Sequence, residues 1–139
     1  MYIDMDREYL SEREANNYSP LSLAFLGDSV YDTLVREHLL RQANMPVAKL
    51  HSAKVKLVCA EFQSDAYDKL AEVLTEREIA VLKRGRNATG NTVPKHAEAA
   101  QYRRATAVES LFGYLFLTGR NERIRELFGI MVPEEKNNG

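Results

Sequence analysis

Two acidic residues stand out because each interrupts an otherwise apolar, helix-length segment. Asp28 lies within residues 21–43, and Glu109 lies within residues 105–117. A carboxylate on a buried helix face costs several kcal/mol unless a cation, backbone donors or a metal ion compensates it. For Asp28 alone, the N-cap of a second helix and a buried ion pair are structural alternatives. If both helices pack in the core, the two carboxylates can converge and supply the oxygen ligands that suit Mg²⁺ or Mn²⁺.

Basic residues are concentrated just before Glu109. The 139-residue chain has a net charge of −1, but residues 83–104 hold six basic residues against one acid, a balance of +5 that leaves −6 elsewhere. A local positive patch matters more for nucleic-acid binding than the total charge does. Metal-holding carboxylates beside such a patch are what metal-assisted phosphodiester hydrolysis requires. The alternative for each cation is an ion pair with a neighbouring acid, or simple solvation.

Apolar residues at helical spacing predict that both acids lie on helices. Ser19 can cap the first helix and Pro20 suits its first position, and the helix is expected to run to about Ala43. Glu109 falls on a helix expected over residues 97–117. The apolar face of the first helix includes its acid. Its members are Leu21, Ala24, Phe25, Asp28, Tyr31 and Val35.

The rest of the chain also has helical spacing, so the predicted fold class is all-α. An amphipathic helix is expected from Val47 to about Val73, with its apolar face in the core and a potential kink near residues 51–53. Thr75 and Glu78 form a capping box that opens the next helix. That helix should fade at residues 85–90, residues 87–96 have loop composition, and a short helix is expected over about 122–128.

The length fits one domain, 1–139, with its core over about residues 19–128. The polar segment 1–18 and the tail 131–139 are expected to be loose or to form at most a short helix. Cys59 is interpreted as a buried free thiol, and a lone cysteine favours the reducing cytoplasm. No segment resembles a signal peptide or a membrane helix, so no membrane association is expected.

Three motifs in order resemble the catalytic domain of ribonuclease III. Residues 23–31, Leu-Ala-Phe-Leu-Gly-Asp-Ser-Val-Tyr, are similar to its helix motif, and residues 102–116 are similar to its second acidic motif. Residues 81–88, Val-Leu-Lys-Arg-Gly-Arg-Asn-Ala, lie between them. Since no double-stranded RNA-binding domain follows, the chain resembles the Mini-ribonuclease III branch of this family, over roughly residues 19–128.

The resemblance implies a homodimeric endonuclease with the ribonuclease III helical fold and one active site per subunit, cutting opposite strands of double-stranded RNA with Mg²⁺ or, as a substitute, Mn²⁺. It implies that Asp28 is the catalytic acid, that Glu109 is its metal-binding partner, and that Phe25 packs across the dimer interface. The implied task is maturation of the large-subunit ribosomal RNA precursor in bacteria, for which a ribosomal protein could present the substrate.

Two positions depart from full-length ribonuclease III, which has acids where this chain has Ala24 and Thr106. Mini-ribonuclease III shares this smaller acid set, so the departures support that branch while leaving the number of metal ions open. They also keep open a non-catalytic RNA-binding dimer with the same fold, and, less strongly, a helical protein–protein module. Asp32, one turn after Asp28, is interpreted as a solvent-facing or interface acid.

Without a separate RNA-binding module, the catalytic domain must hold its substrate itself. A-form RNA is held mostly through phosphates and 2′-hydroxyls, so binding should depend strongly on salt and more on shape than on sequence. We assign this contact to the basic and polar side chains before Glu109: Lys83, Arg84, Arg86, Asn87, Lys95, His96, Arg103 and Arg104.

Overall fold

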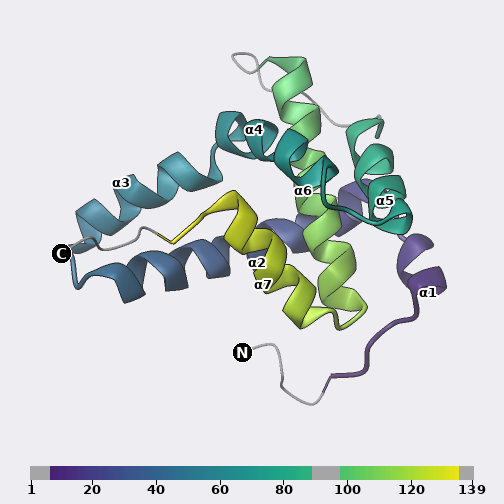
Figure 1. The fold of residues 1–139 in the computed structure, drawn as a ribbon, viewed down its shortest axis with the longest axis horizontal. Coiled ribbons are helices and arrows are strands. Elements are labelled where there is room, and N and C mark those ends of the chain that lie inside the picture. Colours follow the sequence, from purple (N-terminus) through teal and green to yellow (C-terminus); the bar gives the residue numbers. More distant parts are fainter. Residues whose placement is uncertain (1–6, 89–97, 135–139) are drawn as a thin grey trace.

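The fold is all-α, as the sequence predicts. We describe residues 7–88 and 98–134 of a computed structural model, in which helices are the only regular secondary structure (Figure 1). No helix in these two ranges has the length and apolar character needed to cross a bilayer. The helices are α1 (Glu12–Asn16), α2 (Pro20–Gln42), α3 (Val47–Val58), α4 (Ala60–Ala71), α5 (Glu76–Arg86), α6 (Ala99–Leu117) and α7 (Asn121–Met131).

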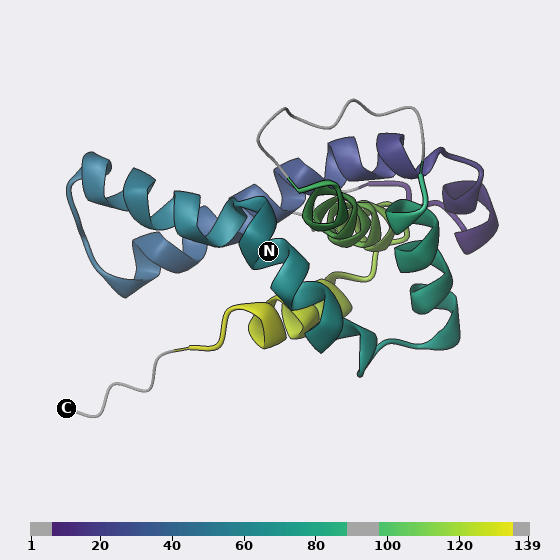
Figure 2. The same cartoon turned by 90° about the horizontal axis from the view of Figure 1, so that it is seen from above.

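Helix α6 is the centre of the fold. Figure 2 looks nearly along its axis and shows α2 on one side, α5 on another, and α4 and α7 on the face opposite α2. The core around it is partly aromatic: the ring of Tyr31 packs edge-on against Phe112, with centroids 5.6 Å apart, and against Phe128, at 5.9 Å. Since α6 is covered from several sides, almost all of its middle is buried.

The backbones of α2 and α6 touch where the two helices cross. A Cβ atom on Gly27 would lie 1.7 Å from the carbonyl oxygen of Glu109, and one on Gly113 would lie 2.0 Å from the carbonyl oxygen of Leu23. No side chain fits at these distances, so glycine is required at both positions. Gly27 is buried because α6 covers it. The crossing places Asp28, the next residue, beside the turn of α6 that carries Glu109.

The predicted boundaries of the first long helix and of α5 are confirmed because local capping chemistry determines them. The Ser19 side chain accepts a hydrogen bond from the backbone of Ser22 at the start of α2. Thr75 and Glu78 form the expected capping box at the start of α5. Glu78 is also buried against Arg123 of α7, whose Nε and Nη2 donate to its carboxylate over 3.0 and 2.8 Å.

The long amphipathic helix predicted after Pro46 is instead two helices, and the expected kink near residues 51–53 is wrong. The break occurs at Cys59, where the backbone is extended with φ −68° and ψ 156°. The buried Tyr31 hydroxyl donates to the carbonyl oxygen of Leu57 over 2.6 Å at the end of α3. This partner comes from α2, so the spacing within the segment itself could not indicate where the helix ends.

Because of the break, the predicted apolar face does not form one core surface. Val55 is 51% exposed and Val73 is 45% exposed. Cys59 is a free thiol as expected, but it is half-buried rather than fully buried. Within the polar N-terminal segment the short helix α1 does form, and Glu12 ties it to the rest through ion pairs with Arg77 and Arg120.

Gly27→Ala should destabilise the fold by about 3 kcal/mol or more, because the new methyl group would collide with backbone atoms of α6 that cannot rotate away. Gly129→Ala is the matched control: a Cβ there meets nothing within 4 Å. Since alanine favours a helix over glycine, the control should be neutral or stabilising by up to about 1 kcal/mol. Urea unfolding of both variants measures this, and equal stabilities would contradict the close crossing.

Candidate active site

Asp28 and Glu109, 81 positions apart in sequence, are neighbours in the structure. Burial raises the pKa of Glu109, and the hydrogen bond to Asp28 and the negative charge of Asp28 raise it further, to about 8. The protonated Glu109 carboxyl therefore donates to the Asp28 carboxylate. Because the pair retains this proton at neutral pH, a cation that bound beside the two acids would be stabilised there.

The environment of Asp28 differs from the expectation. We predicted it on a buried face, yet its side chain is exposed in the single chain and only Glu109 is partly enclosed. The buried face of α2 runs through Leu23, Gly27 and Val30, so it is rotated away from Asp28. The prediction took the apolar face of α2 that includes Asp28 as the buried one, whereas α6 packs against the adjacent face, which contains Gly27.

The two structural alternatives for Asp28 do not hold. Helix α2 continues through it without a new cap, and within the described ranges no Arg or Lys forms an ion pair with either acid. Ala24 and Thr106, where full-length ribonuclease III has acids, are 9% and 7% exposed. Over the described part of the chain, no group of three or more His, Cys, Asp or Glu is placed to hold a metal ion.

Asp32 does not join the acid pair. Its carboxylate lies 2.7 Å from Nε of Arg36 and 3.1 Å from Nζ of Lys54. Partial burial opposes ionisation, but the hydrogen bonds and charges of these two cations outweigh it and hold the pKa of Asp32 below its ordinary value. Asp32 therefore links α2 to α3 as an ion-pair partner.

Tyr31 is a neighbour of the acid pair to which our sequence analysis gave no role in the site. It is completely buried, and its pKa is raised by burial first and then by the nearby Cys59 and Glu109. Because its hydroxyl also holds the end of α3, it connects the α3–α4 break to the acid pair. The sequence feature that could have indicated this role is the position of Tyr31 one helical turn after Asp28.

The predicted RNA-binding side chains come from two helix ends that lie toward the same end of the molecule (Figure 1). Lys95 and His96 lie outside the described residues. The other six divide between the end of α5, with Asn87 directly after it, and the first turns of α6. These residues are Lys83, Arg84, Arg86, Asn87, Arg103 and Arg104.

Several of these side chains already have partners within the chain. Arg84 donates to the side-chain oxygen of Asn16 over 3.3 Å. Arg104 pairs with Asp68 at 3.2 Å, so the alternative of an ion pair with a nearby acid applies to it. Lys83 and Arg103 are exposed. The cluster therefore combines exposed cations with cations held in place by neighbouring groups.

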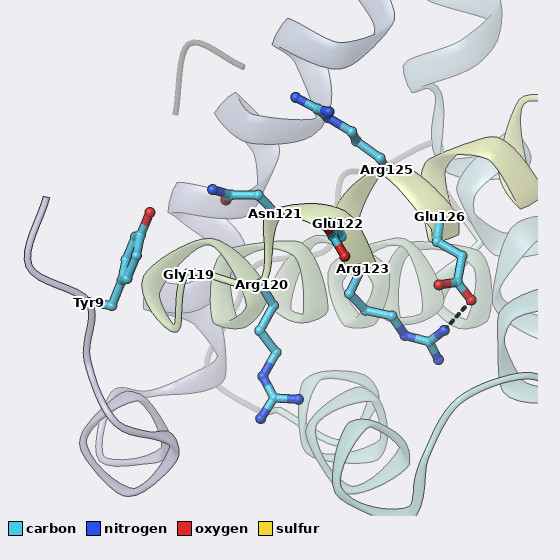
Figure 3. Close-up of a pocket in the computed structure, with 8 residues that line it drawn as sticks. All are labelled: Tyr9, Gly119, Arg120, Asn121, Glu122, Arg123, Arg125 and Glu126. Atoms are coloured by element: carbon cyan, nitrogen blue, oxygen red, sulfur yellow. Dashed lines mark hydrogen bonds and ion pairs between the residues drawn. The ribbon is translucent and has the colours of Figure 1, made fainter. Parts of the chain in front are cut away.

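A pocket of about 720 Å³ lies at the start of α7, between Tyr9 and Glu126 (Figure 3). Its lining includes neither acid of the pair. Arg123, which lines the pocket, forms an ion pair from Nη1 to Oε1 of Glu126 at 2.6 Å and another to the buried Glu78. Two charged residues of this pocket thus join helices, Arg123 to α5 and Arg120 to α1, and the acid pair remains the candidate active site.

Known proteins resemble this chain in sequence and in fold. Residues 21–120 match the family model of the ribonuclease III domain. Mini-ribonuclease 3 of Thermoanaerobacter sp. is 40% identical, covering 90% of this chain and 88% of that protein. Mini-ribonuclease 3 of Brevibacillus brevis is 43% identical, covering 88% and 91%. A Fusobacterium nucleatum protein of known crystal structure superposes with a TM-score of 0.76 at 31% identity, covering 83% of this chain and 92% of that one.

The acid pair predicts an unusual titration. Without divalent ions, the carboxyl carbon of Glu109 should titrate near pH 8 in ¹³C NMR spectra. In Asp28→Asn the midpoint should fall, because the like charge is gone, but stay above the ordinary value of 4.5 because burial remains. A wild-type midpoint near 4.5 would contradict the pairing.

The same shift predicts how stability depends on pH. Between about pH 4.5 and 8 folded Glu109 keeps its proton while the unfolded chain loses it, so this group lowers the free energy of unfolding as pH rises. Asp28→Asn should therefore be more stable than the wild type at pH 8, by about 1 kcal/mol, the order of one pKa unit. Urea unfolding at pH 5 and pH 8 in EDTA measures the difference, and a wild type that gains stability relative to the variant as pH rises would contradict it.

Proposed function

Because the chain belongs to the ribonuclease III domain family and is an endoribonuclease of that type, we propose that it hydrolyses double-stranded RNA with a divalent metal ion. The observation that supports the proposal most directly is the convergence of Asp28 and Glu109. The proposed substrate is the large-subunit ribosomal RNA precursor, which would place the enzyme in the cytoplasm and allow a ribosomal protein to present the RNA.

Mg²⁺, with Mn²⁺ as a substitute, is the proposed cofactor, and Asp28 and Glu109 would hold it. Their fit follows from charge, since the pair keeps a proton on Glu109 up to about pH 8 in the absence of a cation. One or two carboxylates, completed by water and substrate phosphate, are a usual protein contribution to an Mg²⁺ site. When bound, the ion would polarise the phosphate and lower the pKa of an attacking water.

The two acids differ in access. Asp28 is exposed and open to a phosphodiester backbone, whereas Glu109 is partly buried near Tyr31, and its backbone carbonyl lies against Gly27 of α2. The cations at the ends of α5 and α6 would attract the RNA, and Glu109 would release its proton to solvent when a divalent cation binds beside it. The chain thus supplies both a cationic binding surface and a pair of carboxylate ligands.

A non-catalytic RNA-binding dimer with the same fold is the alternative. It is favoured by the small acid set, since the described residues offer two grouped acids and not three. The two functions differ in products: the alternative retains duplex RNA without cutting it under any metal condition.

Incubation of a long duplex RNA with Mg²⁺ or with EDTA, followed by gel electrophoresis, tests the activity. Asp28→Asn should slow cleavage by on the order of 10³-fold, as expected for loss of a group that stabilises charge in the transition state. RNA binding should be nearly unchanged. Asp32→Asn is the matched control on the same helix and should keep cutting. Comparable cleavage by Asp28→Asn would refute the catalytic assignment.

Metal binding can be read without activity. Mg²⁺ should lower the NMR midpoint of Glu109 from about pH 8, because the cation competes with the proton. No such shift should occur in Asp28→Asn at the same Mg²⁺ concentration. An unchanged wild-type midpoint at saturating Mg²⁺ would place the ion elsewhere.

We also propose a homodimer in which Phe25 lies at the interface. Phe25 is 84% exposed in the single chain, so it is not an ordinary core residue. It lies on α2, one turn before Asp28, so an interface there would adjoin the acid pair. Phe25→Ala should raise the dimer dissociation constant by about 30-fold, since buried aromatic anchors often contribute about 2 kcal/mol. Sedimentation equilibrium measures this, with the exposed Val73→Ala as the control that should stay dimeric.

A further inference from the structure

Two guanidinium groups from different helices share the ring of Tyr67. Arg86, the last residue of α5, donates from Nη1 to the Tyr67 hydroxyl over 3.0 Å, and its Cζ lies 5.9 Å from the ring centroid. The Cζ of Arg104, on α6, lies 5.4 Å from the same centroid. Tyr67 is only 6% exposed, so it is a fixed platform that sets the positions of both cations.

Charge at this cluster is not balanced. Asp68 pairs with Arg104 at 3.2 Å, and its side chain is 70% exposed. Arg86 is half-buried and forms no ion pair with any described residue. Of the two cations only Arg104 has a carboxylate partner, and that carboxylate is exposed, so the cluster carries an excess of positive charge that a bound anion would neutralise.

We propose that Arg86 and Arg104 bind one backbone phosphate of the RNA, and that Asp68 occupies Arg104 in the free protein as an internal competitor of that phosphate. Planar guanidinium groups match phosphate and carboxylate oxygens alike, so the two anions can exchange on the same side chain. The proposal rests on the proposed RNA cleavage and adds a residue that weakens substrate binding.

The position of the cluster fits this role. Arg104 precedes Glu109 by five residues on α6, which is about 7.5 Å along the helix axis. A phosphate on Arg104 would thus lie one to two helical turns from Glu109 along α6, with the two side chains leaving the helix on different sides, about 140° apart. An exposed ion pair such as Asp68–Arg104 contributes little to stability, so replacing Asp68 by a phosphate at Arg104 would cost the fold little.

The test is binding of a short fluorescent RNA duplex, measured by anisotropy in EDTA so that no cleavage occurs. Asp68→Asn should tighten binding about threefold to tenfold at low salt, because Arg104 becomes free to contact phosphate. Asp65→Asn is the matched control: it removes the same charge from an exposed site one turn earlier on α4. Equal effects of the two variants would overturn the proposal, since both would then reflect only the loss of one negative charge from the surface.

A double-mutant cycle identifies Arg104 as the group that Asp68 blocks. Arg104→Gln should weaken binding about tenfold and reduce the slope of log affinity against log salt by about one. In that background Asp68→Asn should have no more effect than Asp65→Asn. A full Asp68→Asn effect without Arg104 would overturn the proposed competition.

Tyr67→Phe tests the platform, because it removes the hydroxyl that holds Arg86 while keeping the ring. It should weaken duplex binding about threefold with unchanged cleavage per bound duplex, which separates positioning from catalysis. Unchanged binding in this variant counts against the Arg86 half of the site. If the wild type binds no duplex RNA, the proposed function itself fails, whereas a wild type that binds and cuts RNA beside inert cluster variants refutes only the phosphate site.

Discussion

The contact between the backbones of α2 and α6 is the constraint on which the site depends. Two glycines, Gly27 and Gly113, let the helices cross at a distance that no side chain would allow. Each glycine lies within four residues of an acid, so the crossing itself brings Asp28 to Glu109. The helix packing thus determines both where the carboxylates meet and that one of them is partly withdrawn from water.

The acids that join helices differ from the acid pair in what neutralises them. Glu78, Glu12 and Asp32 each lie against arginine or lysine side chains, and these pairs join helices that are distant in sequence. Asp28 and Glu109 have each other and a shared proton instead. An arginine or lysine partner would neutralise the acid pair and compete with a bound cation. Within the described residues neither acid has such a partner, which fits a site that binds a cation from solution.

The surface of α2 shows the same division. One side of the helix is buried against α6, while Phe25 and Asp28 face outward from the single chain. On the buried side, Tyr31 lies near Glu109 and its hydroxyl holds the end of α3, which connects the α3–α4 break to the site. Near the start of α6, the buried Tyr67 contacts Arg86 through its hydroxyl and Arg104 through its ring. A buried tyrosine therefore lies beside the acid pair and another beside the arginine cluster.

Sequence by itself determined the features that depend on neighbouring residues: the all-α class, the helix starts at Ser19 and Thr75, and the two acids as the candidate site. These follow from side chains that cap the adjacent turn and from spacing within one segment. Tertiary structure alone decided the break at Cys59, the exposure of Asp28 and the pairing of Arg104 with Asp68 rather than with solvent. Each of these depends on a partner 26 to 36 positions away, or on which side of a helix is covered. Local periodicity shows that a helix has an apolar face, but only packing against α6 selects the side that is buried.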